Sequence, residues 1–189
     1  MKNTKLLNMV LLAMLAGLIF LMGQTPLGLI PLGFCNVTLL VIPVAVGTIY
    51  MGWRSGLVLG AAFAGTSLVS ALLRPSALVA TLLGASPVLA IVMTVLPRLC
   101  IPLVIAGVNH LLQKKQKHVA AAVAAACGSV TNTVLYLGLM LLFYVMCGID
   151  NTTVLTTIGA VAGGAGPLEA LAAAIITPPI LMALWRVRK

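Results

Sequence analysis

Long runs of apolar residues, interrupted by short polar or proline- and glycine-rich breaks, dominate this sequence. No charged residue occurs between Leu6 and Trp53. A helix needs about 20 apolar residues to cross a bilayer, so this stretch is long enough for two transmembrane helices. Prolines and glycines within residues 24–33 prevent one continuous helix. The pattern therefore predicts a first span over residues 5–23 and a second over residues 37–52.

Four more apolar runs follow the same rule. A turn at residues 52–56 and the pair Arg74–Pro75 bound the third run, and a lysine-containing loop separates the fourth from the fifth. The glycine-rich segment 159–166 is expected to form a flexible outer loop, because glycine supplies turns. The remaining spans are predicted at residues 56–73, 87–113, 119–147 and 167–185. The sequence thus predicts an all-α integral membrane protein with one six-helix domain over residues 1–189.

The positively charged residues cluster on one side of these spans. Placing the N-terminus in the cytoplasm leaves only Arg74 on the outer side, while Arg98 falls within the fourth span. Cytoplasmic loops carry an excess of Lys and Arg, so both termini are predicted to be cytoplasmic. The residues that this orientation places inside are Lys2, Lys5, Arg54, Lys114, Lys115, Lys117, Arg186, Arg188 and Lys189.

A cleaved signal peptide is an alternative interpretation of residues 1–24, which have a lysine-bearing start and an apolar core. This apolar run is longer than the roughly 7–15 residues of a signal-peptide core. Cleavage would also leave five spans and put the positively charged loops outside. We therefore expect the first span to be retained.

The composition narrows the class of protein. Of the 189 residues, 62% are hydrophobic and only 7% are charged, whereas soluble domains carry about 25% charged residues. A soluble enzyme, a disordered tail and a secreted disulfide scaffold are excluded.

The net charge of +9 would suggest nucleic-acid binding in a soluble chain, but only 5% of the residues are aromatic and available for stacking on bases. The four cysteines have no C-x-x-C spacing and are interpreted as apolar packing residues.

The polar residues argue against catalysis and metal binding. The sequence has no G-x-x-x-x-G-K-[ST] phosphate loop and no His or Cys cluster with the spacing of a metal site. Ser129 and Thr131 are candidate nucleophiles, but no His lies at membrane depth to act as their base. We expect neither an enzyme nor a bound cofactor or metal ion.

Arg98 is the outstanding polar residue. Counted at 1.5 Å per residue, it lies about 16 Å along the helix from Pro87 and thus near mid-membrane. A charge at that depth costs about 2.5–3.5 kcal/mol even on lenient insertion scales, so Arg98 should face the bundle interior and a partner. Thr94 lies one turn earlier on the same helix face.

Two interpretations of Arg98 remain open. It either forms a salt bridge with Glu169, the only acid within a span, or it awaits an anionic ligand. Glu169 is expected in the first turn of the sixth span, near the outer surface and well above Arg98, where the helix dipole favours an acid without any arginine. The fifth span adds Ser129, Asn132 and Tyr136, which share one stripe at helical spacing. Asn132 is expected within one or two turns of the depth of Arg98.

The first span has a feature of its own. Ala13 and Gly17 have the small-x-x-x-small spacing that lets another helix approach closely in lipid, and Ala16 lies beside them. These residues either pack within the chain or contact a partner.

Several short stretches, in this order on six spans, resemble the substrate-binding S components of energy-coupling factor (ECF) vitamin transporters. The resemblance covers essentially the whole chain and is to the subgroup with pantothenate- and riboflavin-type members. The matching stretches are residues 25–31, 42–44, 52–56, 96–98, 129–133, 167–170 and 177–179.

The resemblance implies a vitamin-binding pocket open to the outside, formed by span ends and the loop after the first span. It implies a bacterial plasma-membrane location and a partner module of one membrane coupling (T) protein and two ATPase subunits. Small residues on the first span contact the coupling protein in that family, a role for Ala13, Ala16 and Gly17; the family's Ala-x-x-x-Ala is Ala-x-x-x-Gly here. The S component delivers its ligand by reorienting in the membrane. The candidate binding residues are Arg98, Asn132, Thr94, Ser129, Tyr136, Asn36 and Glu169.

Pantothenate is the favoured substrate, because a small carboxylate suits Arg98 with its nearby hydroxyl and amide groups. Riboflavin is uncharged and planar and needs apolar or aromatic walls, so it or another vitamin or precursor is the alternative. A non-transporting membrane scaffold is the alternative class, and it would need neither Arg98 nor a polar stripe. A channel or secondary transporter ranks lower, because Glu169 is its sole acid for a coupling ion.

Overall fold

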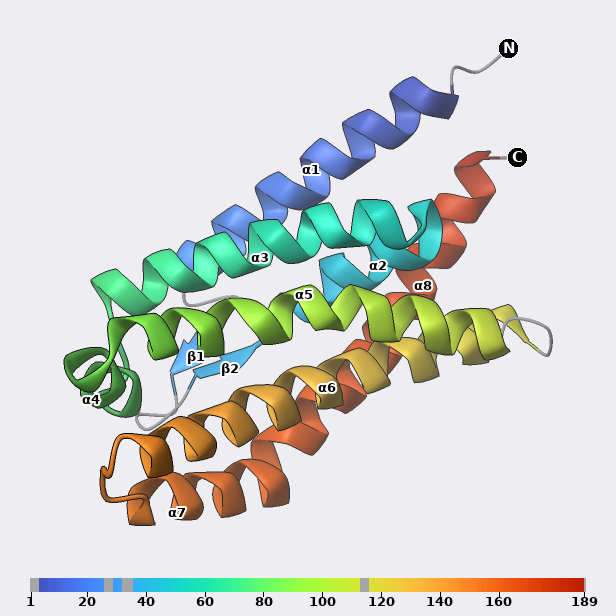
Figure 1. Ribbon diagram of the computed structural model, residues 1–189. Helices are drawn as coiled ribbons and strands as arrows, with labels where there is room; N and C mark the ends of the chain where they lie inside the picture. Colours follow the sequence, from blue (N-terminus) through green and yellow to red (C-terminus); the bar gives the residue numbers. More distant parts are fainter. Residues whose placement is uncertain (1–3, 26–28, 32–35, 113–115, 189) are drawn as a thin grey trace.

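The computed structural model describes residues 4–25, 29–31, 36–112 and 116–188 and is dominated by helices (Figure 1). Of the predicted positive residues, Lys2, Lys114, Lys115 and Lys189 lie outside this description. In chain order the elements are α1 (Thr4–Gln24), β1 (Leu29–Pro31), β2 (Asn36–Thr38), α2 (Val41–Met51), α3 (Trp53–Leu73), α4 (Ala77–Ala85), α5 (Pro87–Leu112), α6 (Lys117–Met146), α7 (Thr152–Ala160), a π-helical turn η1 (Val161–Ala165) and α8 (Gly166–Arg188).

Most of the helices are long and apolar enough to cross a membrane. Within the described residues, five stretches meet this condition: Lys5–Gln24, Trp53–Leu73, Pro87–Leu112, Lys117–Met146 and Thr152–Arg186. Helix α2 is also apolar but has only 11 residues, a length of about 16 Å. The predicted class, an all-α membrane protein, is confirmed.

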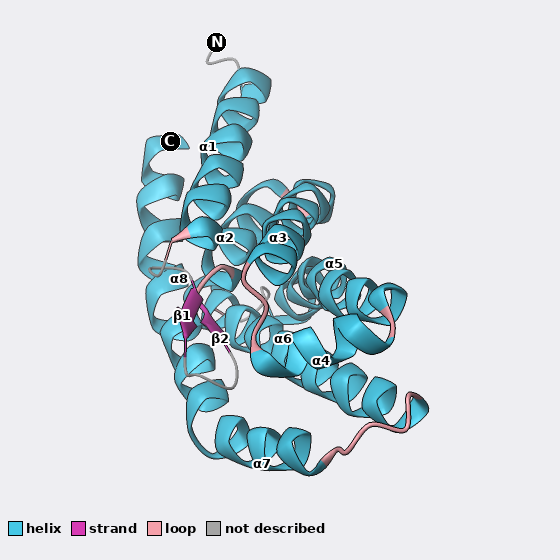
Figure 2. Cartoon of the chain, turned by 90° about the vertical axis from the view of Figure 1, so that its left-hand side faces the viewer, coloured by secondary structure: helices cyan, strands magenta, loops and turns pink. Residues whose placement is uncertain are grey.

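The bundle has two distinct ends. The start of α1, the end of α5, the start of α6 and the end of α8 lie at one end, which we call the termini end (Figure 1). The two strands, α4 and α7 lie at the other, which we call the hairpin end. Figure 2, turned by 90°, shows the hairpin between α8 and α4. Two termini at one end agree with an even number of membrane crossings.

Helix α2 lies at the centre of the bundle. It contacts α1, α3, α5, α6 and α8, and its residues from Val41 to Thr48 are all buried. A helix that is apolar on every face is stable where neighbouring helices cover it. Gly52, with φ of +98°, then turns the chain directly into α3, a conformation that glycine adopts without steric cost.

A short hairpin replaces the start of the predicted second span. Strands β1 and β2 pair antiparallel, with Leu29 opposite Thr38. The sequence predicts one helix over residues 37–52, but helix α2 begins only at Val41. The β-branched residues Val37 and Thr38 favour a strand, and the pairing satisfies backbone groups that a broken helix would expose.

The expectation of a flexible loop at residues 159–166 is wrong. Helix α7 continues through the π turn η1 directly into α8, so this glycine-rich segment is helical throughout. A glycine costs a helix about 1 kcal/mol relative to alanine, whereas each unsatisfied backbone group in lipid costs several. Membrane surroundings therefore favour helix even over Gly163 and Gly164.

Candidate functional site

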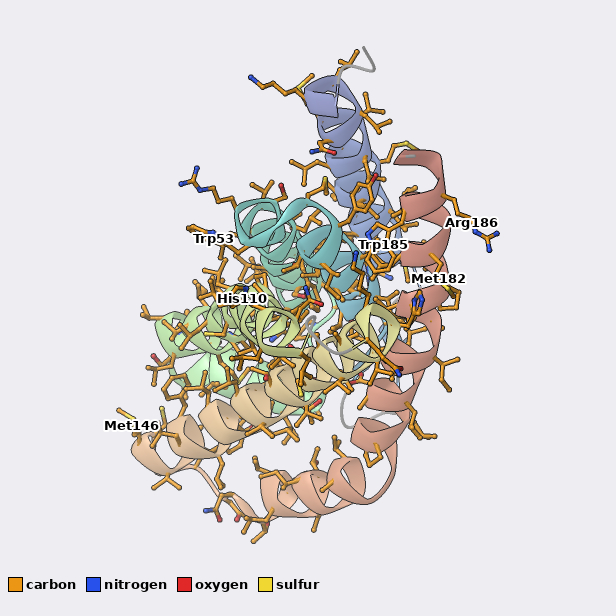
Figure 3. The ribbon with its side chains drawn as sticks, turned by 90° about the vertical axis from the view of Figure 1, so that its right-hand side faces the viewer. Trp53, His110, Met146, Met182, Trp185 and Arg186 are labelled. Atoms are coloured by element: carbon orange, nitrogen blue, oxygen red, sulfur yellow. The ribbon has the colours of Figure 1, made fainter. Side chains whose placement is uncertain are left out.

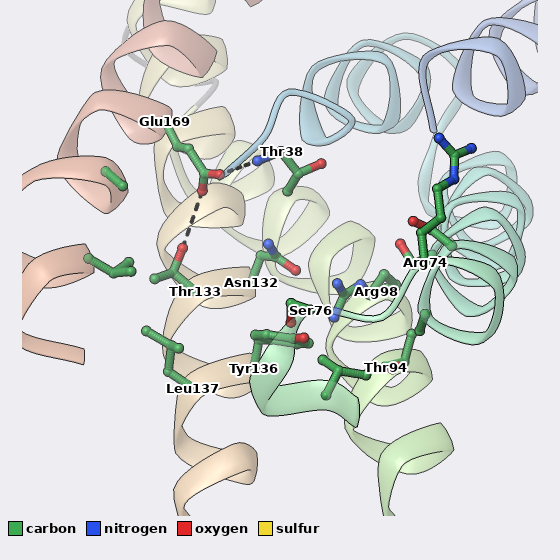
Figure 4. A pocket seen from close by; sticks show the side chains of 16 residues that line it. Thr38, Arg74, Ser76, Thr94, Arg98, Asn132, Thr133, Tyr136, Leu137 and Glu169 are labelled. Atoms are coloured by element: carbon green, nitrogen blue, oxygen red, sulfur yellow. Dashed lines mark hydrogen bonds between the residues drawn. The ribbon is translucent and has the colours of Figure 1, made fainter. Parts of the chain in front are cut away.

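A polar cavity of about 80 Å³ opens between α3, α5, α6, α8 and strand β2 (Figure 4). Hydroxyl groups dominate its polar wall, and two arginines and one carboxylate add charge. The polar residues that line it are Thr38, Ser67, Ser70, Arg74, Ser76, Thr94, Arg98, Asn132, Thr133, Tyr136 and Glu169. Such a surface suits a small polar ligand with an anionic group.

Arg98 is buried in this cavity, with only 8% of its surface exposed. Its Nε and Nη1 atoms are buried and have no hydrogen-bond partner among the described residues. The guanidinium carbon lies 4.7 Å from the ring centre of Tyr136 and 5.4 Å from that of Phe63. These cation–π contacts offset part of the cost of burial, but they do not replace hydrogen-bond acceptors. The arginine therefore retains unused capacity to bind an anion.

Helix packing explains how α3 and α5 bring this arginine to the cavity. Pro102 has no N–H, so the carbonyl of Arg98, four residues earlier, loses its usual helical donor. Gly60 of α3 faces that carbonyl: a Cβ added there would lie 2.7 Å from the oxygen and 3.2 Å from Cγ of Pro102. The glycine thus permits close approach of the two helices, and Phe63 follows it by one turn.

Glu169 lies on another wall of the same cavity. It occupies the first turn of α8, as the sequence predicts. Its carboxylate accepts the backbone N–H of Thr38 and the hydroxyl of Thr133, the latter at 3.4 Å. No ion pair joins Glu169 to Arg98 among the described residues, although both line one cavity. The carboxylate therefore holds strand β2 against α6 and α8 and leaves the arginine available.

The structure brings together most of the residues that the sequence singles out. Thr94, Arg98, Asn132, Tyr136 and Glu169 all line the cavity. The Oδ1 atom of Asn132 is buried and has no partner among the described residues, and the hydroxyl of Thr94 donates to the carbonyl of Ala90.

Two other predicted residues are placed differently. Ser129 is buried with an unpartnered hydroxyl in the described part of the chain, but it does not line the cavity. The backbone of Asn36 belongs to strand β2, and its side chain lies outside the described residues.

Other polar residues of the cavity are not predicted as site residues from the sequence. These are Thr38, Ser67, Ser70, Arg74, Ser76 and Thr133. Ser67 and Ser70 are three residues apart, which puts both on one face of α3, and this spacing was a usable signal. No sequence pattern predicts Thr38 in the cavity wall, because its position depends on how the hairpin folds back over the bundle.

The small residues of α1 do not share one environment. Ala13 and Gly17 are exposed, and a Cβ added at Gly17 would meet no atom within 4 Å. Ala16 is half-buried and packs against the core that contains Ile19 and Leu59. The outward face of α1 at residues 13 and 17 is thus free for another helix within the described structure.

A comparison with models of known protein families finds one match. The model of the family described as "ECF transporter, substrate-specific component" matches residues 7–181. This match includes every cavity residue described above. A comparison with curated proteins finds no match.

Proposed function

Because this chain belongs to the family of substrate-specific components of ECF transporters, we propose that it captures a small anionic vitamin, pantothenate in first place, at Arg98. Members of this family are non-catalytic, substrate-binding subunits of the plasma membrane, and they act with a T component and ATPases. The chain is accordingly a multi-pass membrane protein and not an enzyme. The proposal concerns the ligand and the residues that bind it.

The Nε and Nη1 atoms of Arg98, which are buried without a hydrogen-bond partner among the described residues, carry this proposal. A carboxylate binds arginine through charge-assisted hydrogen bonds, often two in parallel. It would supply acceptors for Nε and Nη1, which have none among the described residues. It would also neutralise a charge that Glu169 leaves unpaired.

Pantothenate fits the remainder of the cavity wall. It carries an amide and hydroxyl groups beside its carboxylate, and the wall offers the amide of Asn132 with hydroxyls on α3, α5 and α6. Riboflavin would form hydrogen bonds here but would leave the charge of Arg98 unneutralised. We therefore rank riboflavin and other vitamins or precursors second.

We expect ligand binding to enlarge the cavity. Its volume of about 80 Å³ holds a few water molecules, whereas pockets for drug-sized ligands measure roughly 300–1,000 Å³. The contact between Thr38 and Glu169 joins the hairpin to the bundle. We expect this hairpin to shift when a vitamin enters.

Delivery of the vitamin follows from the partner module. We place both termini in the cytoplasm, where the sequence has its excess of Lys and Arg, and the cavity toward the outside. The exposed residues Ala13 and Gly17 form the contact with the coupling protein, whereas Ala16 packs inward. The whole subunit reorients in the membrane while the ATPases hydrolyse ATP.

A titration of the detergent-solubilised protein tests this proposal. Replacing Arg98→Ala should weaken pantothenate binding by about 100-fold or more, because each hydrogen bond to a charged group contributes about 1.5–3 kcal/mol. Arg54→Ala is the matched control, since Arg54 contacts Trp53 and does not line the cavity. Unchanged affinity of the Arg98 variant would remove this residue from the site. A protein that binds no vitamin and purifies without a T component or ATPases would favour a scaffold.

A further inference from the structure

A second cavity, of about 530 Å³, lies at the termini end of the bundle. It shares no residue with the cavity around Arg98. Its wall comes from the ends of α5, α6 and α8 and includes Asn109, Lys117, His118, Met182, Trp185 and Arg186. The family match and the proposed function leave this site without a role.

The charge around this cavity is one-sided. Lys117 and Arg186 are cationic, and the only two acids of the chain, Asp150 and Glu169, belong to the hairpin end. The first turn of α6 contains no acid, and Gln116 makes no side-chain hydrogen bond to it. The positive end of the α6 dipole adds to the two cations, and the negative ends of α5 and α8, which also reach this wall, offset part of that charge. Neither of the two acidic side chains of this protein lies at this end of the bundle, so this cationic part of the wall is open to an anion from outside the chain.

The rest of the wall is aromatic and apolar. The ring of Trp185 lies 6.2 Å from that of His118, tilted by 49°, and Met182 lies one turn earlier on α8. Figure 3 shows Trp185 and Arg186 on different sides of α8. Both residues line the cavity, and we call Arg186, which is exposed, its rim residue. Tryptophan is enriched where hydrocarbon meets lipid headgroups. The cavity thus combines a cationic part with an apolar part at the depth of a membrane surface.

We propose that this cavity binds the phosphate group of an anionic phospholipid. Lys117, His118 and the rim residue Arg186 face the phosphate, while Met182 and Trp185 contact the adjoining acyl chains. The proposal is independent of the vitamin site and would stand if Arg98 had another role.

The two tryptophans of the chain, Trp53 and Trp185, provide a test with an internal control. Trp53 is half exposed and lies 5.5 Å from the guanidinium carbon of Arg54, outside the cavity. The full chain is reconstituted in vesicles that contain phosphatidylglycerol or phosphatidylcholine with brominated acyl chains, which quench nearby tryptophans. Trp53→Phe reports on Trp185 alone, and Trp185→Phe reports on Trp53 alone. Inorganic phosphate is added in a separate series. It shows whether the phosphate group alone is enough for binding to this cavity or the lipid chains are also needed.

Quenching of Trp185 should need a lower mole fraction of brominated phosphatidylglycerol than of brominated phosphatidylcholine. Each basic residue that contributes to binding should lower the required mole fraction about fivefold. This preference should disappear when Lys117→Gln and Arg186→Gln are combined, and it should survive Arg54→Gln. Relief of quenching by inorganic phosphate would identify the phosphate as sufficient, and no relief would identify the intact lipid as the ligand. Equal quenching by the two lipids, the same preference at Trp53, or a preference that persists in the double variant would overturn the proposal.

Discussion

Gly60 of α3 lies directly against the main-chain carbonyl of Arg98 on α5. A Cβ added at this glycine would come within 2.7 Å of the oxygen, closer than real Cβ atoms approach. The same turn of α3 leads to Phe63, whose ring lies beside the guanidinium of Arg98. One residue without a side chain thus sets the distance between two helices and the position of a buried charge.

Gly60→Ala should lower the melting temperature and weaken ligand binding. The new methyl group meets backbone, which cannot rotate away, and such overpacking costs about 1–3 kcal/mol. Gly65→Ala is the matched control on the same helix, because a Cβ there meets no atom within 4 Å. It should be neutral or slightly stabilising through helix propensity. Thermal unfolding in detergent measures both, and equal melting temperatures for the two variants would contradict the packing described here.

Arg98→Met should leave the melting temperature of the ligand-free protein unchanged or raise it. Two buried guanidinium nitrogens without acceptors are costly, and an apolar side chain of similar length removes that cost. The rise in melting temperature that pantothenate causes should be lost at the same time. A large fall in the melting temperature of the ligand-free variant would show instead that Arg98 serves the fold.

The sequence predicts the helices well where a span is uniformly apolar, and poorly where short elements depend on their neighbours. The runs that became α3, α5 and α6 are long and free of acids, so hydropathy suffices to find them. The hairpin, α4 and α7 are each too short to span a bilayer, and their formation depends on packing at the hairpin end. The glycines of segment 159–166 predict a loop where the structure has helix, because turn propensity measured in water does not apply in lipid.

The cavity was partly predictable for a similar reason. Arg98 stands out because a charge in hydrocarbon is costly, and Asn132 and Tyr136 follow from helical spacing. The contact between Glu169 and Thr38 joins residues 131 positions apart. No local pattern encodes it, because it depends on how the hairpin folds over α8.

Glu169→Ala should release the hairpin. The backbone N–H of Thr38 would lose its acceptor, and a hydrogen bond to a charged group contributes about 1.5–3 kcal/mol. Hydrogen exchange at the amide of Thr38 should therefore accelerate about tenfold or more. Glu169→Gln keeps one acceptor oxygen and should have a smaller effect. Unchanged exchange in both variants would show that Glu169 does not hold the strand.

Asp150, in the connection between α6 and α7, should make the start of α7 sensitive to pH. The backbone N–H and the hydroxyl of Thr152 donate to its carboxylate at 3.0 and 2.9 Å, and these bonds lower the pKa of Asp150 below its ordinary value of 3.8. A lowered pKa in the folded state means that the ionised group stabilises the fold above pH 3.8 and that this contribution is lost as the pH falls through the folded pKa.

Asp150→Asn should therefore increase hydrogen exchange at the first amides of α7 at neutral pH. The difference from the natural protein should shrink as the pH falls below 3.8. A difference that stays constant over this range would show that the charge of Asp150 is irrelevant to α7.

Mass spectrometry of the small molecules retained by the purified protein tests the central claim most directly. The natural protein, Arg98→Ala and Arg54→Ala would be purified from the same host and denatured to release what they hold. The expected result is a vitamin with a carboxylate, pantothenate in first place, retained by the natural protein and by the Arg54 variant and lost from the Arg98 variant. Retention of an uncharged vitamin, or equal retention of the anion by all three proteins, would contradict the assignment of Arg98 as the anion-binding residue.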